Sequence, residues 1–325
     1  MNEEAKKLRI VFMGTPEFAV PSLRALVEGG YQVVGVVTTP DTPAGRGQRL
    51  HESDVKIAAR ELGLPILQPE RLRDEAFIEA MRALKPDLGI VIAFRMLPEV
   101  IWAMPRLGTF NLHASLLPQY RGAAPINWAI INGEGESGVT TFLLNHEIDK
   151  GAIIGQERVK ILPEDNVGTL YDKLMHIGTG LVTQTVDRIA SGDIQPVEQQ
   201  HIDESTLRPA PKIFKEDCRI DWRKTGKQIV DFIRGLSPYP AAWTELHREG
   251  EEGSALLTAK IFSASFLPAT HHEACGAIQS DFRNEIRVAC ADGWLSLGEV
   301  QLAGKRRLPV KELLLGWRDV NQYHC

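Results

Sequence analysis

Reactive polar side chains gather where an apolar stretch of the chain gives way to a loop. Residues 109–118 read Thr-Phe-Asn-Leu-His-Ala-Ser-Leu-Leu-Pro. Side chains of a strand alternate between its two faces, so Asn111 and His113 should project to the same side. An amide can donate a hydrogen bond to an oxyanion, and an imidazole can exchange a proton near neutral pH. By itself such a pair is more often structural, but the pairing suits acyl transfer.

A third polar group follows a second strand-like run, residues 138–144. Two acids, Glu147 and Asp149, lie in the loop after this run. A carboxylate near an imidazole favours the protonated ring and fixes its orientation. Asp149 is the candidate partner of His113. Glu147 could play the same part, and either acid could be an ordinary surface residue.

The first half of the chain alternates between strand and helix signals. Short apolar runs predict strands, amphipathic spacing predicts helices between them, and the alternation predicts an α/β fold with a doubly wound, mostly parallel sheet. A dinucleotide-binding oxidoreductase shares this architecture, but the turn after the first strand contains Gly14 without a G-x-G-x-x-G fingerprint. The predicted strands are 8–13, 32–38 and 88–93, and the predicted helices are 18–27 and 55–62.

A polar, proline-punctuated stretch divides the chain. It predicts a linker at 193–212 between a catalytic domain at 1–192 and a second domain at 213–325. The second domain should begin with a helix at 226–235. Regularly spaced short runs then predict the strands of a small β-barrel. These runs are 242–246, 256–262, 286–289 and 294–300.

Composition indicates an ordinary globular protein, with 43% hydrophobic and 24% charged residues. No apolar run approaches the roughly 20 residues that span a bilayer, so we expect a cytoplasmic protein without membrane contact. The four cysteines show no C-x-x-C spacing, which favours structural thiols over disulfides or a metal site. No metal is expected.

Charge is informative locally rather than globally. The net charge is −5, yet from residue 213 onward 15 Lys and Arg face 15 Asp and Glu. A polyanionic partner would therefore meet patches rather than the whole surface. One patch is the Gly/Pro-rich stretch 40–49, with Arg46 and Arg49, and the other is Lys305-Arg306-Arg307. Short basic runs are usually solvated faces, so composition alone leaves their role open.

The pattern Asn-Leu-His-x-Ser-Leu-Leu-Pro, followed by Asp149 in a Gly-bounded loop, resembles the folate-dependent formyltransferases. The resemblance implies that Asn111, His113 and Asp149 are the polar residues of the active site. It also implies folate-binding segments that meet the donor 10-formyltetrahydrofolate. These comprise Ser115, Leu116, Leu117 and Pro118 along the site, and Phe94, Arg95 and Met96 against the pterin ring.

Two further stretches resemble the branch of this family that acts on methionyl initiator tRNA. They are Pro-Asp-Thr-Pro-Ala-Gly-Arg-Gly at 40–47 and Ala-Gly-Lys-Arg at 303–306. In that branch the loop carrying Arg46 enters the tRNA acceptor end, and the basic side of an OB-like barrel contacts the tRNA backbone. Amino-sugar formyltransferases lack this loop but share Trp128 and the Gly-Ala-Ile form at 151–153. The Lys at 150 departs from the Thr usual in the methionyl branch.

We therefore expect an enzyme that moves the formyl group of 10-formyltetrahydrofolate to the α-amino group of methionine on charged initiator tRNA. The expected RNA contacts are Arg46, Arg49, Lys305, Arg306 and Arg307. An amino-sugar nucleotide N-formyltransferase is the alternative. A non-catalytic RNA-binding module is less consistent with the sequence, because such a module has no use for the trio of Asn111, His113 and Asp149. We expect a monomer.

Overall fold

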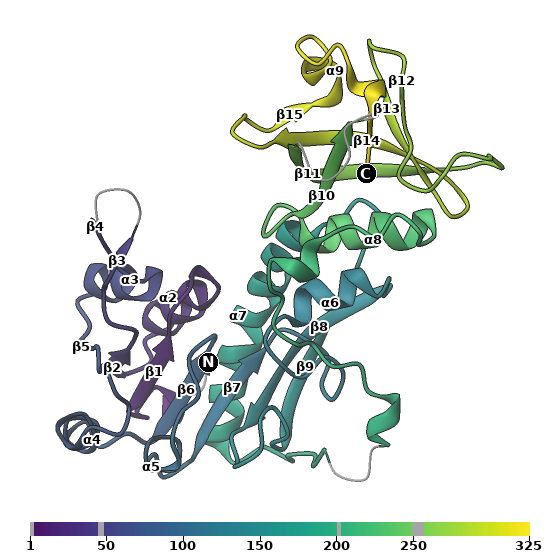
Figure 1. The fold of residues 1–325 in the computed structure, drawn as a ribbon. Helices are drawn as coiled ribbons and strands as arrows, with labels where there is room; N and C mark the ends of the chain where they lie inside the picture. Colours follow the sequence, from purple (N-terminus) through teal and green to yellow (C-terminus); the bar gives the residue numbers. More distant parts are fainter. Residues whose placement is uncertain (1–2, 45–48, 200–202, 249–256) are drawn as a thin grey trace. The chain divides into compact units, whose positions relative to one another are not determined.

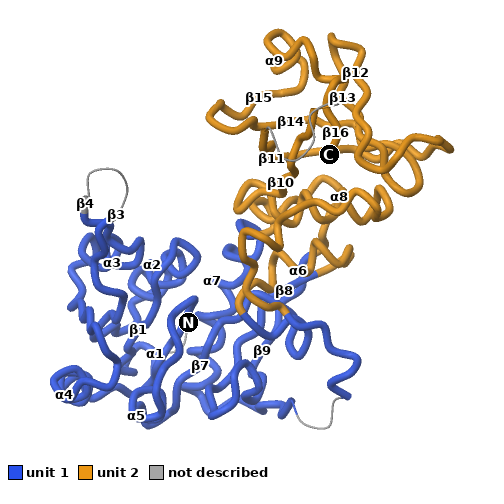
Figure 2. Tube along the Cα trace, in the orientation of Figure 1, with its two compact units in different colours: residues 1–122, 137–159, 171–209 blue, residues 123–136, 160–170, 210–325 orange. Residues whose placement is uncertain are grey.

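The computed structural model describes residues 3–44, 49–199, 203–248 and 257–325. They form two compact units (Figures 1 and 2). The first unit comprises 1–122, 137–159 and 171–209, and the second comprises 123–136, 160–170 and 210–325. Each unit thus draws on more than one stretch of chain. The division into continuous domains at 192 and 213 remains a prediction.

The first unit contains most of the helices and strands of the N-terminal half. They are α1 (Glu3–Lys6), β1 (Ile10–Gly14), α2 (Val20–Glu28), β2 (Val33–Val37), β3 (Thr42–Ala44), β4 (Arg49–His51), α3 (Asp54–Glu61), β5 (Ile66–Leu67), α4 (Glu75–Ala83), β6 (Leu88–Ile92), α5 (Glu99–Trp102), β7 (Thr109–His113), β8 (Glu136–Leu143), β9 (Ile153–Lys160) and most of α7 (Val167–Ser191). Short 3₁₀ turns lie at Glu17–Ala19 and Glu204–Thr206.

A seven-stranded sheet organises this unit, in the order β5-β2-β1-β6-β7-β8-β9. The strands from β5 to β7 pair in parallel, whereas β8 runs antiparallel to β7. Helices lie between successive parallel strands, as Figure 1 shows. The prediction of a doubly wound, mostly parallel sheet is confirmed.

Both faces of the sheet are covered, which explains why its strands read as continuous apolar runs. On one face, Met13 packs in a buried cluster with Phe77 of α4 and Ile101 of α5. On the other, α7 approaches β7 closely, because a Cβ added at Gly178 would lie 2.9 Å from a methyl group of Leu112. The sequence did not predict α7, whose 25 residues form the longest helix among the described residues.

The second unit contains a short helical layer and a β-barrel. Its elements are α6 (Pro125–Ile131), α8 (Gly226–Leu236), β10 (Ala242–Arg248), β11 (Leu257–Pro268), β12 (Ile278–Ser280), β13 (Ile286–Cys290), β14 (Gly293–Leu302), β15 (Leu308–Pro309), α9 (Val310–Leu313) and β16 (Tyr323–His324), with 3₁₀ turns at Glu216–Cys218 and Val320–Gln322. The strands pair antiparallel in the order β12-β13-β14-β11-β10-β16, with β15 beside β14.

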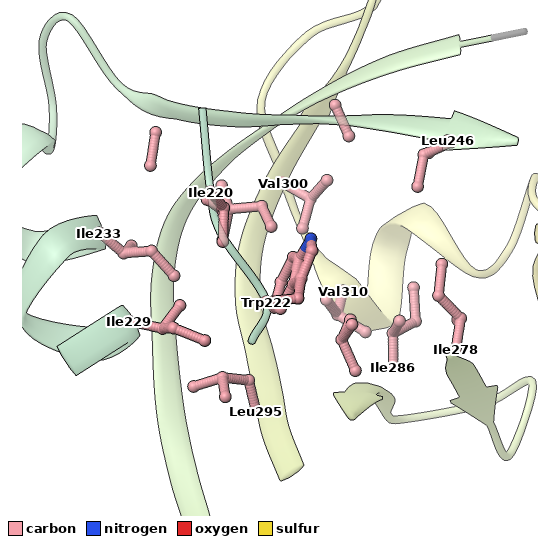
Figure 3. Packing of buried hydrophobic residues seen from close by; sticks show 14 of the residues in the cluster. Ile220, Trp222, Ile229, Ile233, Leu246, Ile278, Ile286, Leu295, Val300 and Val310 are labelled. Carbon is pink, nitrogen blue, oxygen red and sulfur yellow. The ribbon is translucent and has the colours of Figure 1, made fainter. Parts of the chain in front are cut away.

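A single bridge nearly closes this sheet into a barrel. Ala277, next to β12, pairs with His324 of β16, so the two ends of the strand order meet. Figure 3 shows the interior, where Trp222 lies among aliphatic side chains such as Ile220 and Val300. The indole Nε1 donates a hydrogen bond to Thr244 Oγ1 at 3.0 Å, so the buried ring has no unsatisfied donor. The predicted small β-barrel is confirmed.

A strong N-terminal signal fixes the start of α8. The Thr225 side chain caps the helix by accepting a hydrogen bond from the backbone N–H of Gln228. The Gln228 side-chain oxygen in turn accepts one from the backbone N–H of Thr225. This capping box satisfies two donors that would otherwise lack partners. The helix then buries Ile229 and Ile233 against the barrel core. The predicted helix at 226–235 is therefore present.

The proline-rich stretch at 40–49 contains a feature that the sequence did not reveal. β3 and β4 pair as an antiparallel hairpin, with Thr42 opposite His51 and Pro43 opposite Leu50. At its base, a hydrogen bond from the Lys56 ammonium holds the pKa of the Asp41 carboxyl below its usual value.

Within the described ranges, no helix is long and apolar enough to cross a membrane.

Candidate active site at the ends of β6 and β7

β7 places Asn111 and His113 on one face of the sheet, at its carboxyl end. Asn111 is half-buried and His113 is buried, while the intervening Leu112 points to the α7 face. His113 lies opposite Thr140 of β8 in the antiparallel register. In open α/β sheets, ligands bind beyond the carboxyl ends of the strands. The position of the pair is thus that of a binding site.

The backbone of the following loop fixes the imidazole of His113. His113 Nε2 lies 2.9 Å from the carbonyl oxygen of Tyr120. A carbonyl can only accept a hydrogen bond, so the neutral ring carries its proton on Nε2 and leaves Nδ1 free. Tyr120, whose carbonyl contacts His113, has a φ of 61°, in the left-handed region.

The loop between β8 and β9 brings Asp149 to the other side of the ring. Its Oδ2 accepts a hydrogen bond from the backbone N–H of Gly122 at 3.0 Å and lies 3.9 Å from His113 Nδ1. The latter distance exceeds a hydrogen bond, but it is short enough for a carboxylate to stabilise a protonated imidazole. Of the two ring nitrogens, Nδ1 is therefore the one that faces the carboxylate.

Glu147, the alternative acid, faces a different partner. Its carboxylate lies 3.0 Å from the ammonium of Lys150, and its side chain is largely exposed. Lys150 also bonds Glu204, and these two contacts raise the pKa of Lys150, the Glu204 bond most strongly. Of the two candidate acids, Asp149 is the one whose carboxylate approaches His113.

Asn111 has an unsatisfied group inside the site. Its Oδ1 is buried and has no hydrogen-bond partner among the residues that the structure describes. Leaving a buried polar atom unpaired costs about 1–3 kcal/mol. A ligand that donates a hydrogen bond would satisfy this oxygen.

Hydrogen bonds to β8 and β9 shape the segment at 115–118. Thr140 Oγ1 donates to the carbonyl of Ser115 at 2.6 Å and accepts from the N–H of Leu117 at 3.1 Å. Gln156 donates to both the Leu117 carbonyl and Thr140. The Ser115 hydroxyl is itself bonded within the loop, to the carbonyl of Gln119. Polar side chains from two neighbouring strands thus hold the loop backbone.

Burial separates the four residues of this segment. Ser115 and Leu117 are buried, whereas Leu116 and Pro118 are half-buried. Thr140, which was not predicted, bonds the backbone of Ser115 and of Leu117. Its sequence signal is weak, since it lies beside a second fully buried threonine, Thr141, in the same strand.

The second candidate folate segment follows β6, the strand beside β7. Ala93 has a φ of 46°, so the chain turns sharply at the end of β6. The guanidinium of Arg95 lies 5.7 Å from the centre of the Phe94 ring and donates to the carbonyls of Pro69 and Glu70. Met96 is 74% exposed. This segment leaves the sheet at the same edge as the end of β7.

The candidate RNA-contacting residues fall into two groups. Arg46 lies outside the described residues, and Arg49 is described only by its backbone position in β4. Lys305 and Arg306 are exposed between β14 and β15 in the second unit. Arg307, also exposed, already pairs with Glu299 and lies over an aromatic ring. Lys305 and Arg306 therefore keep more of their charge available to a partner.

Within the described ranges, no group of three or more His, Cys, Asp or Glu side chains could hold a metal ion. The cysteines Cys218, Cys275, Cys290 and Cys325 are all free thiols.

Comparison with known proteins assigns the chain to a family. The model described as formyl transferase matches residues 8–186, and the one described as formyl transferase, C-terminal domain, matches residues 212–318. The chain belongs to the formyl transferase family, whose members use folate-derived formyl donors. Asn111, His113 and Asp149 all lie within the first match.

Individual proteins of known name or structure are also similar to this chain. A protein of Parabacteroides distasonis named methionyl-tRNA formyltransferase is 59% identical over 97% of this chain and 98% of its own length. Among solved structures, an N-formyltransferase from Helicobacter canadensis in complex with folinic acid and dTDP-3-aminofucose aligns with a TM-score of 0.62, at 19% identity over 93% of this chain and 100% of that one. HypX from Aquifex aeolicus in complex with tetrahydrofolic acid aligns with a TM-score of 0.61, at 19% identity over 94% of this chain and 47% of that one. At these identities the two structural likenesses concern the fold.

We predict that Thr140→Val, which keeps the side-chain shape, lowers the free energy of unfolding by about 1–3 kcal/mol. The reason is that the variant leaves buried partners of the hydroxyl unsatisfied. Thr183→Val is the matched control, because the Thr183 hydroxyl bonds only a carbonyl of its own helix, and its effect should stay within about 0.5 kcal/mol. Chemical denaturation measures both. Equal effects would contradict the supporting role of Thr140.

Proposed function

We propose that this chain transfers the formyl group of 10-formyltetrahydrofolate to the α-amino group of methionine on charged initiator tRNA. The observation that supports the reaction most directly is the arrangement of His113 between the Tyr120 carbonyl and the Asp149 carboxylate, on the same strand as Asn111, whose buried Oδ1 has no hydrogen-bond partner among the described residues. The observation that supports the acceptor is the 59% identity to a protein named methionyl-tRNA formyltransferase over nearly the whole of both chains.

In this reaction the amine attacks the formyl carbon, the bond from that carbon to the folate nitrogen breaks, and one proton passes from the amine to that nitrogen. Negative charge develops on the formyl oxygen during the attack. Asn111 would stabilise this charge through its side-chain N–H group, and His113 would do so through a proton on Nδ1. His113 can hold a proton on Nδ1, and Asp149 stabilises the charged ring and orients it.

The donor would occupy the edge of the sheet where β6 and β7 end. Its contacts would come from Phe94, Arg95 and Met96 after β6 and from Ser115 to Pro118 after β7. Ser115 and Leu117, being buried, would act through the loop backbone, whereas Leu116 and Pro118 can meet the donor with their side chains.

The barrel of the second unit and the stretch 40–49 of the first would bind the RNA. We propose a catalytic domain at 1–192, a linker at 193–212 and an OB-like tRNA-binding domain at 213–325. The two family matches support this division, because the first ends at 186 and the second begins at 212. Arg46, Arg49, Lys305, Arg306 and Arg307 are the proposed tRNA contacts. We also propose that the protein acts as a cytoplasmic monomer.

One assay tests the proposed reaction and its acceptor together. The protein is incubated with labelled 10-formyltetrahydrofolate and with charged initiator tRNA, glycinamide ribonucleotide or an amino-sugar nucleotide. Label should appear on the charged initiator tRNA. Label on the amino-sugar nucleotide alone would instead establish the alternative acceptor.

We expect Asn111→Ala, His113→Ala and Asp149→Ala each to lower kcat by about 100-fold or more, the scale for losing an oxyanion donor or a proton-handling group. Glu147→Ala is the matched control, because that carboxylate pairs with Lys150 on the same loop, and its turnover should stay close to wild type. Single-turnover formylation with saturating donor measures all four. Near wild-type turnover for Asp149→Ala together with loss for Glu147→Ala would show that the wrong acid is assigned.

The RNA contacts should appear in the dependence of binding on salt. Replacing Lys305 or Arg306 by Ala should lower the log–log salt slope by roughly one unit each, because each phosphate contact releases counterions. The affinities for initiator and elongator tRNA should fall by the same factor, since phosphate contacts carry no sequence information. Arg307→Ala should change the slope less because Arg307 already pairs with Glu299.

Arg46→Ala should behave differently, with a selective loss of kcat/KM for charged initiator tRNA. Arg283→Ala, an exposed change in the β12–β13 turn, is the control for general charge effects. Filter binding at several salt concentrations and initial-rate formylation give the two readouts. If none of these substitutions changed tRNA binding or formylation activity, the proposal that tRNA is the acceptor would be contradicted.

A further inference from the structure

We propose that Gln199 is a positioning residue for formyl transfer, which holds Asp149 in place beside His113. The proposal rests on the function proposed above for this site. Gln199 lies in the stretch that the sequence predicts to be a linker, yet its side chain is only 8% exposed. A buried amide in such a stretch needs partners, and those partners belong to the site.

The Gln199 side chain joins two loops of the site. Its Nε2 donates to the carbonyl of Asp149 at 3.0 Å and to the carbonyl of Gly151 at 2.7 Å. Its Oε1 accepts from Arg121 Nη2 at 2.8 Å. The orientation of the amide is determined, because a flipped amide would set its oxygen against two carbonyls and its NH₂ group against a guanidinium.

The Asp149 loop needs such bonds from outside. Asp149 has a φ of 54°, and a left-handed conformation at a residue other than glycine is strained and persists only where the surroundings enforce it. At Gly151 the chain runs so close to β8 that an added Cβ would lie 1.6 Å from the carbonyl oxygen of Leu143. Gln199 bonds the backbone on both sides of Lys150, between these two constrained positions.

These contacts form a closed ring of bonded residues that includes the Asp149 carboxylate. Asp149 Oδ2 accepts from the N–H of Gly122. Gly122 follows Arg121 in the chain, Arg121 bonds Gln199, and Gln199 bonds the Asp149 carbonyl. Removing the amide therefore opens the ring at two points at once, and the carboxylate loses the support that fixes its distance from His113.

Gln199 is itself anchored. Two residues before it, Val197 exchanges both backbone hydrogen bonds with Ile153 at the start of β9, each 2.8 Å long. Because β9 begins just after the Asp149 loop, the segment that carries Gln199 is fixed to the end of the loop that it supports. The amide is thus placed on a rigid support, as a positioning group requires.

Two variants and a control separate positioning from simple stability. Gln199→Leu keeps similar bulk but removes all three hydrogen bonds. Gln199→Glu keeps an acceptor for Arg121 but turns a carboxylate oxygen toward the carbonyls of Asp149 and Gly151. Gln195→Leu, at an exposed position of the same segment, is the matched control. Both Gln199 variants should lower kcat by about 10- to 100-fold, the range for a catalytic group misplaced by about 1 Å, with each KM within about twofold of wild type.

A double-mutant cycle with Asp149→Ala gives the decisive readout. If Gln199 acts through Asp149, adding Gln199→Leu to Asp149→Ala should cause less than about a twofold further loss, because a shared interaction is lost only once. Losses that multiply in the double variant would overturn the proposal. A Gln199→Leu protein with wild-type kcat would also overturn it, even if its melting temperature fell.

The variants are assayed with whichever acceptor the wild-type protein formylates. An error in the proposed acceptor then appears in the wild-type protein, whereas an error in the role of Gln199 appears only in the variants and in their cycle with Asp149.

Discussion

The hydrogen bond from His113 Nε2 to the Tyr120 carbonyl is the interaction on which the rest of the site depends. It sets the plane of the imidazole and decides which ring nitrogen is free. Once Nε2 is committed to the backbone, only Nδ1 can take up a proton, and the Asp149 carboxylate lies on that side. The acid and the imidazole could not cooperate in this way if the 118–122 loop took another course.

The antiparallel strand β8 makes this arrangement possible. Where β7 ends, β8 runs alongside it in the opposite direction, and Thr140 stands opposite His113. The hydroxyl of Thr140 bonds the loop that leaves β7, and the far end of β8 leads into the loop that carries Asp149. One strand therefore supports the segment at 115–118 and also leads into the loop that carries Asp149. Each of the two loops contains a non-glycine residue in a left-handed conformation.

Much of the scaffold could be predicted from the sequence, because hydrophobic period and turn residues report local structure directly. The strands β1, β2 and β6, the shared face of Asn111 and His113, the helix α8 and the barrel strands all follow from such patterns. The choice between Glu147 and Asp149 could not be made in that way. Both acids lie in one loop, and only the tertiary course of the loop shows which carboxylate meets the imidazole.

Other features depend on contacts between residues far apart in the chain. Gln199 lies in a polar stretch that reads as a linker, and its role becomes visible only through bonds to a loop about fifty residues earlier. Thr140 lies beside a second buried threonine, Thr141, and the sequence alone does not show which of the two bonds the loop. In both cases a tertiary hydrogen bond decides the structure, and local sequence does not encode it. The hairpin of β3 and β4 is a local pairing, but it lies in a proline-rich stretch whose composition indicates a loop.

The central claim is that the Tyr120 carbonyl holds neutral His113 as the Nε2–H tautomer, with Nδ1 open toward Asp149. Nitrogen-15 NMR of the His113 ring measures this directly, through long-range couplings between the ring protons and each nitrogen at a pH where the ring is neutral. The account predicts a protonated Nε2 and an unprotonated Nδ1, and a shift of the Nδ1 resonance on acidification. A neutral ring protonated on Nδ1 would contradict it.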